Sequence, residues 1–170
     1  MKLIKLTALP LIVLGSLVVL SSCESDAELK KTTDFQKSGI VMSGAKETPA
    51  VPSAAIGKMD VFYTRETRTL SYTVTWSGLT DSVNAMHIHG LAPEGYAAAV
   101  VQNIVAASNS IYPQKTSGKY TYAKSGTLSG TLLVDGTVIK ENDLINGQYY
   151  LNIHTSVYPG GEIRGQITFQ

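Results

Sequence analysis

The stretch "TLSYTVTW", residues 69–76, alternates apolar and polar side chains without a break. One parity holds the apolar residues Leu70, Tyr72, Val74 and Trp76. Successive residues of a β-strand point to opposite faces of a sheet, so this pattern predicts a strand with one face against a core. We therefore expect the Trp76 side chain to be buried.

Other segments on both sides of this stretch have the pattern of strands. They are residues 58–64, 84–90, 126–134, 147–155 and 161–169. Turn residues separate them, as at Asp135-Gly136 and Asn146-Gly147. Only residues 140–147 suggest a short helical turn, and no segment has a long 3.6-residue period. We expect residues 36–170 to form one all-β domain, an antiparallel Greek-key-like β-sandwich, with a closed barrel as the alternative.

The composition of the chain fits a globular protein and argues against nucleic-acid binding. Of its 170 residues, 44% are hydrophobic and 16% are charged, and the net charge is +1. Lysines and arginines never occur in runs longer than two. Without a basic cluster there is no electrostatic footprint for nucleic acid, and we expect none as a partner.

The first 22 residues have the pattern of a secretory leader. Lys2 and Lys5 precede an apolar stretch at residues 6–20. Fifteen residues, interrupted by Pro10, are too few for a transmembrane helix, which needs about 20. We therefore expect residues 1–22 to be a signal peptide outside the folded domain.

The sequence "LSSC", residues 20–23, resembles a bacterial lipobox, and Cys23 is the only cysteine. The resemblance implies cleavage before Cys23 and acylation of this residue, which would anchor the chain to a membrane. A plain secretory signal with an unrelated cysteine is the alternative. Residues 23–35 are polar and are expected to form the acylated residue and a flexible tether. The expected location is the cell envelope, at the outer membrane, facing the periplasm or the cell surface.

The three histidines of the chain are expected on the same kind of sheet surface. In residues 84–90, Met86 and Ile88 share the apolar face, so His87 and His89 take the other. By the same alternation, His154 lies opposite the apolar residues of the strand 147–155. In residues 161–169 the same rule places four polar residues outward: Glu162, Arg164, Gln166 and Thr168.

Three histidines on such a surface suggest a metal site. His87 and His89 are about 6.6 Å apart along a strand, and both rings can lean onto one ion. His154 on a neighbouring strand would complete a three-nitrogen site, which suits copper or zinc better than calcium or magnesium. Residues 91–125 could cover it. The alternative is that these histidines are solvated or bonded to loop carbonyls.

Several segments together resemble the CHRD (chordin) domain. They include "LSYTVTWSGLTDSVNAMHIHGLAPEGYAAAVV" and "DLINGQYYLNIHTSVYPGGEIRGQI". The resemblance covers about residues 36–170, and it includes a structural signature made by Gly161, Glu162, Arg164 and Gly165. Within this signature the Glu162 and Arg164 side chains are expected to pair with each other or with neighbouring strands. The resemblance implies a β-sandwich, an extracytoplasmic location, and a binding or structural role with a protein or glycan ligand.

A fainter resemblance links the histidines to copper/zinc superoxide dismutase. By that comparison His87, His89 and His154 match three copper ligands. The bridging histidine, the additional zinc ligands and the structural disulfide of that family have no counterparts here. Dismutase activity is therefore not expected.

No sequence motif indicates a reaction. The chain contains no nucleophile elbow, P-loop or dinucleotide fingerprint, so no catalysis is expected. The sequence is best interpreted as a lipid-anchored, extracytoplasmic binding or structural module of the bacterial envelope. The alternative is a copper- or zinc-binding protein that uses the three histidines.

Overall fold

The computed structural model describes residues 34–105, 114–116, 119–121 and 123–169. The predictions for the signal peptide, for Cys23 and for the tether up to residue 33 lie outside this part of the chain. Among the described residues, no helix has the length and apolarity needed to cross a membrane.

The described residues are almost entirely β-structure. One antiparallel sheet contains eight strands: β1 (Asp34–Ser43), β2 (Ile56–Thr64), β3 (Thr69–Ser77), β4 (Val83–Gly90), β5 (Val100–Val105), β8 (Gly126–Leu133), β9 (Tyr149–Thr155) and β10 (Ile163–Gln166). A separate pair is formed by β6 (Gln114–Thr116) and β7 (Lys119–Thr121). The remaining elements are the 3-10 turn η1 (Gly44–Lys46) and the one-turn helix α2 (Glu141–Ile145). The all-β prediction is confirmed.

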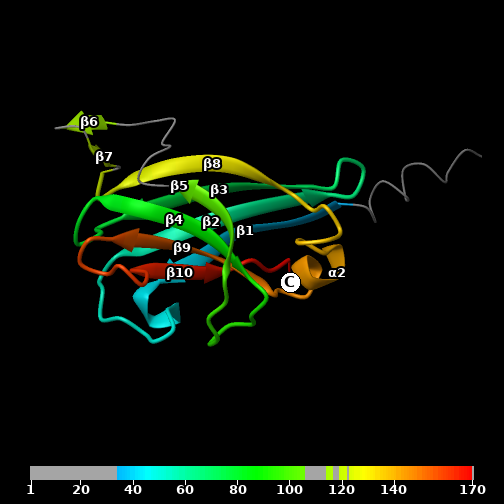
Figure 1. Ribbon diagram of the computed structural model, residues 1–170, viewed down its shortest axis with the longest axis horizontal. Helices are drawn as coiled ribbons and strands as arrows, with labels where there is room; N and C mark the ends of the chain where they lie inside the picture. Colours follow the sequence, from blue (N-terminus) through cyan, green and yellow to red (C-terminus); the bar gives the residue numbers. More distant parts are fainter. Residues whose placement is uncertain (1–33, 106–113, 117–118, 122, 170) are drawn as a thin grey trace, which may run out of the picture.

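The large sheet curls until its two end strands meet. The strand order is β5-β4-β9-β10-β1-β2-β3-β8, and Figure 1 shows β5 beside β8 and β3. The side chain of Gln102 on β5 joins them, because it accepts from Tyr72 Oη on β3 at 3.2 Å and donates to Thr131 O on β8 at 2.8 Å. The fold is therefore a nearly closed barrel, between the predicted sandwich and its alternative.

The hydrophobic core fills the inside of this curl. Trp76 is buried there as predicted, together with the other apolar residues of β3. Leu144 of α2 and Ile139 just before it are also buried and join the same cluster. In Figure 1, α2 lies at the end of the sheet that is near the C-terminus of the chain. The predicted helical turn is thus present and contributes to the core.

Strands β1 and β5 were not predicted. In β1 the pairing with β2 shifts between Lys37 and Ile40, where Gly39 has φ +70°. This irregularity breaks the apolar–polar alternation on which the sequence argument relied. The strand begins at Asp34, two residues before the expected start of the domain.

Strand β9 is buried along its whole length. All seven residues from Tyr149 to Thr155 are buried, although only every second one faces the hydrophobic core. The opposite face of β9, which carries His154, must therefore be covered by another part of the protein.

Candidate metal-binding site

Polar side chains of β4, β9 and β10 stand in register on one face of the sheet. His87 on β4 lies opposite Asn152 on β9, and Asn152 lies opposite Arg164 on β10. The face points away from the hydrophobic core, as alternation predicts. We call it the polar layer and define it by eight residues: His87, His89, Tyr150, Asn152, His154, Glu162, Arg164 and Gln166.

The prediction that these side chains lie on the face away from the core is met, but most of them are covered by protein rather than exposed to solvent. Glu162 is 0% exposed, Arg164 1% and Gln166 5%, and His89 and His154 are also buried. Residues 92–98 lie over the layer, and their backbone groups bond to it. The expectation that the segment after β4 covers the histidines is met by this part of the chain.

The three histidines come together within the polar layer. Their ligand nitrogens all lie within 4.8 Å of one another. His87 Nδ1 is 3.0 Å from His154 Nε2, and the ring centroids of His87 and His89 are 5.5 Å apart. An ion bound at about 2.0–2.1 Å needs ligand atoms about 3.3 Å apart in a tetrahedral site, so the widest gap must close by about 1.5 Å.

Backbone carbonyls fix the orientation of two of the rings. His89 Nδ1 lies 2.9 Å from Ala98 O, and His154 Nδ1 lies 3.0 Å from Pro159 O. A carbonyl only accepts, so each Nδ1 carries the proton and each Nε2 keeps a free lone pair in the neutral ring. Metal-bound histidines are usually held in this way, with the second nitrogen donating to an outer partner.

The surroundings of His87 and His154 favour the neutral form of these two rings. Burial, together with the neighbouring His154 and His89, lowers the pKa of His87 to about 4. Burial is likewise the main reason why the pKa of His154 is lowered, although its bond to Pro159 opposes this. At neutral pH both rings are therefore available as ligands rather than as cations.

Asn152 lies at the centre of the layer. Its Oδ1 is 2.9 Å from His154 Nε2 and 3.1 Å from His89 Nε2. Its side chain also contacts the carboxyl group of Glu47, which follows η1 and whose Oε1 has no hydrogen-bond partner among the described residues. Burial raises the pKa of Glu47 to about 7, against the opposing effects of Arg164 and of the Asn152 contact.

Arg164 supports the layer from β10. Its guanidinium lies 3.4 Å from the ring centroid of Tyr150, and that ring stacks on His89 with 4.7 Å between centroids. Because β9 lies between β4 and β10, Tyr150 is held between the cation and the imidazole. Arg164 also donates to the carbonyls of Tyr96 at 2.8 Å and Pro93 at 3.2 Å, which fastens the covering segment to the layer.

Glu162 does not pair with Arg164, although pairing between the two was one of the expectations. Instead it accepts hydrogen bonds from Ser53 Oγ, Thr155 Oγ1, and both the hydroxyl and the backbone amide of Thr80, at 2.7–2.9 Å. Burial alone would raise the pKa of Glu162, but these donors outweigh it and the pKa is lowered. Glu162 thus ties loops to the sheet, which is a structural role.

The two signature glycines stand where side chains would not fit. A Cβ at Gly161, whose φ is +127°, would overlap Glu47 Oε1 and come within 2.7 Å of Asn152 Nδ2. A Cβ at Gly165 would come within 2.7 Å of Met42 Cγ in the core. Gly161 therefore makes room for the contact between Glu47 and Asn152.

Sequence reasoning missed both Asn152 and Glu47. Asn152 could have been found from the sequence, because it is two positions before His154 on the same strand and its side chain therefore lies on the same face as the histidines. Glu47 lies in a loop, where periodicity says nothing about direction.

The comparison with protein families supports this account. The model of the CHRD domain matches residues 39–167, which include all three histidines and the glutamate–arginine signature. The chain belongs to the CHRD-domain family. Comparison with curated proteins and with solved structures finds no significant match. Membership in the CHRD family supports an extracellular binding or structural module.

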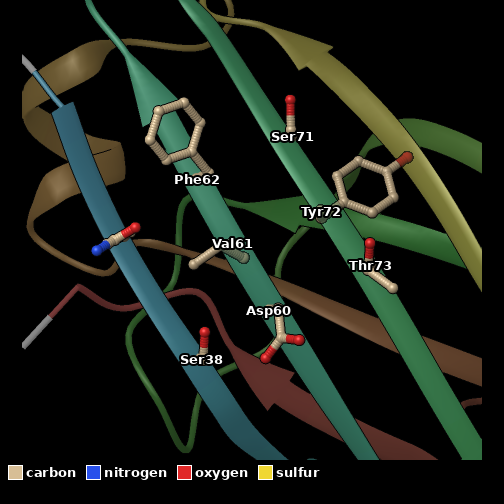
Figure 2. A pocket seen from close by; sticks show the side chains of 8 residues that line it. Ser38, Asp60, Val61, Phe62, Ser71, Tyr72 and Thr73 are labelled. Atoms are coloured by element: carbon tan, nitrogen blue, oxygen red, sulfur yellow. The ribbon is translucent and has the colours of Figure 1, made fainter.

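The CHRD domain also has a shallow hollow on its outer surface, away from the histidines. It has a volume of about 190 Å³ and is lined by residues of β1, β2 and β3. Figure 2 shows Asp60, Ser71 and Thr73 around it, with the ring of Phe62 beside them. No histidine lines this hollow, so it is separate from the polar layer.

Proposed function

We propose that this CHRD domain binds one transition-metal ion, copper or zinc, through His87, His89 and His154. The observation that carries the proposal is the fixed orientation of the rings. Backbone carbonyls hold the Nδ1 atoms of His89 and His154 and leave Nε2 of both rings free, and the ligand nitrogens of all three histidines lie within 4.8 Å of one another. Carbonyl-bonded rings alone would also fit histidines that bind no metal, so the proposal depends equally on the convergence of the three ligand nitrogens.

The ligand set favours copper or zinc. Within the described residues the cluster contains only imidazoles, and carboxylates are absent from it. Calcium and magnesium require oxygen ligands, whereas neutral imidazole suits zinc and copper. The metal would contribute to an extracellular binding or structural role rather than to a reaction.

We further propose that the domain is anchored to the bacterial outer membrane by acylation of Cys23. The lipobox-like "LSSC" and the polar residues 23–35 support this. Metabolic labelling with an alkyne fatty acid should mark the parent and not Cys23→Ser, and fractionation should move the variant out of the membrane. An unlabelled parent would contradict the proposal.

Metal titration tests the binding proposal directly. The full chain, carrying Cys23→Ser to remove the thiol and purified without a histidine tag, is stripped with a chelator and titrated with Cu(II), Cu(I) and Zn(II). We expect one ion per chain in the parent and in the exposed control Lys58→Ala. His87→Ala and His154→Ala should each lose it while keeping the fold by circular dichroism. Failure of the parent to bind, or unchanged binding in both variants, would overturn the proposal.

A further inference from the structure

The side-chain oxygen of Asn152 lies beside the Nε2 atoms of two histidines. Oδ1 is 3.1 Å from His89 Nε2 and 2.9 Å from His154 Nε2. The Nδ1 atom of each of these rings lies against a backbone carbonyl, so the tautomer that fits these contacts has its proton on Nδ1 and a lone pair on Nε2. His87 Nδ1 lies 3.0 Å from His154 Nε2. A metal ion placed among these atoms would be bound by the amide oxygen as well as by the ring nitrogens.

The orientation of the amide is set from its other end. Glu47 contacts the Asn152 side chain, and Asn152 Nδ2 and Glu47 Oε1 both lie close to Gly161. The amide nitrogen therefore faces Glu47, while the amide oxygen faces His89 and His154. This contact outside the cluster is the one that would hold the oxygen toward the histidines.

We propose that Asn152 Oδ1 is a fourth metal ligand, which completes a tetrahedral site of three nitrogens and one oxygen, and that Glu47 is its positioning residue. The inference rests on the metal binding proposed above and names the ligand that completes it. Three separations among the four atoms are already 2.9, 3.0 and 3.1 Å. A tetrahedral site with bonds of about 2.0–2.1 Å requires about 3.3 Å.

A fourth protein ligand changes the type of site. Structural zinc sites are closed by four protein ligands, whereas catalytic sites leave one position to water. An amide oxygen is also a harder ligand than a thiolate or thioether, so it favours Zn(II) or Cu(II) over Cu(I). The ion would then hold β4, β9 and the loop at Glu47 together.

The test asks whether bound Cu(II) has room for an exchanging water. Full chain with Cys23→Ser is loaded with one Cu(II), and the longitudinal relaxation of water protons is measured per bound ion. We expect low relaxivity in the parent and in the exposed control Asn103→Ser. Asn152→Ser should raise it severalfold, since water enters the vacated position, and should weaken zinc binding about 10–100-fold.

Variants of Glu47 test the positioning role. Glu47→Gln keeps an acceptor for the Asn152 amide and should keep the low relaxivity, whereas Glu47→Leu should raise it toward that of Asn152→Ser. Equal relaxivity in the parent and Asn152→Ser, with one ion still bound, would remove Asn152 as a ligand and leave the three-histidine site intact. A parent that binds no ion would overturn both proposals.

Discussion

The side-chain amide of Gln102 donates a hydrogen bond to the backbone carbonyl of Thr131, 2.8 Å away, and so joins the two end strands of the sheet. The hydroxyl of Tyr72 donates to the oxygen of the same amide at 3.2 Å. One side chain therefore stands in for the backbone ladder that a fully closed barrel would have at this seam.

Removing this bridge should weaken the seam. We expect Gln102→Ala to lower the free energy of unfolding by about 1–2 kcal/mol, because the buried Tyr72 loses the acceptor of its hydroxyl and the exposed Thr131 carbonyl loses its donor. Amide hydrogen exchange in β5 should become faster than in β9. Asn103→Ala, an exposed change on the same strand, is the control. Unchanged exchange in Gln102→Ala would show that the seam does not depend on this bond.

The buried carboxylate of Glu162 should be essential to stability. Glu162→Gln places an NH2 group among donors that previously shared a carboxylate, and we expect a loss of about 2–4 kcal/mol in urea unfolding at pH 7. The exposed Glu66→Gln should change little. Because the folded pKa of Glu162 is lowered, its contribution is present above the unfolded value near 4.5 and is lost as the pH falls through the folded value. The free energies of unfolding of the parent and of Glu162→Gln should therefore become similar at acid pH. A difference between them that does not change with pH would contradict this prediction.

Glu47 should have the opposite pH dependence. Its folded pKa of about 7 lies above the ordinary 4.5, so the folded state prefers the protonated acid. The stability of the parent should fall as the pH rises from about 4.5 to 7 and level off above that. Glu47→Gln, which cannot ionise, should be more stable than the metal-free parent by about 1–3 kcal/mol at pH 8. At pH 4 the parent and Glu47→Gln should have nearly equal free energies of unfolding. A stability difference that grows as the pH falls would refute the explanation that burial raises the pKa of Glu47.

Two adjacent glycines offer a matched pair of variants. Gly161→Ala adds a methyl group that overlaps the Glu47 carboxylate and forces a strained φ, so we expect at least about 2 kcal/mol of destabilisation. It should also weaken metal binding, because Asn152 is displaced. Gly160→Ala adds its methyl group in open space and should be tolerated. Thermal unfolding measures the loss of stability, and zinc titration measures the loss of affinity. Equal melting temperatures and equal zinc affinities for the two variants would show that Gly161 is not needed to make room for Glu47 and Asn152.

Sequence patterns predicted some elements of this fold well and others not at all, for physical reasons. β3 has one face in the core and one exposed to solvent, so its alternation is complete and Trp76 was placed correctly. β1 escaped notice because an irregularity at Gly39 shifts its register.

The polar layer shows a different kind of limit. Alternation correctly put His87, His89 and His154 on one face of the sheet, but it cannot tell solvent from a covering loop. Arg164 was therefore expected outside and is buried. The contacts that matter at the site come from Pro159 and Glu47, which lie in loops whose paths no period encodes.

The place of β1 in the sheet decides how the domain would respond to mechanical force. β1 is not an edge strand: it lies between β10 and β2, and its ladder with β2 includes the pairs from Asp34–Thr64 to Ser43–Ile56. Near Asp34, β1 pairs with β2 alone, and its pairing with β10 is at Ser43, so a pull on the chain before Asp34 acts first on the ladder between β1 and β2. Because this ladder lies in the middle of the strand order, its rupture would separate β2, β3 and β8 from the strands that carry the polar layer.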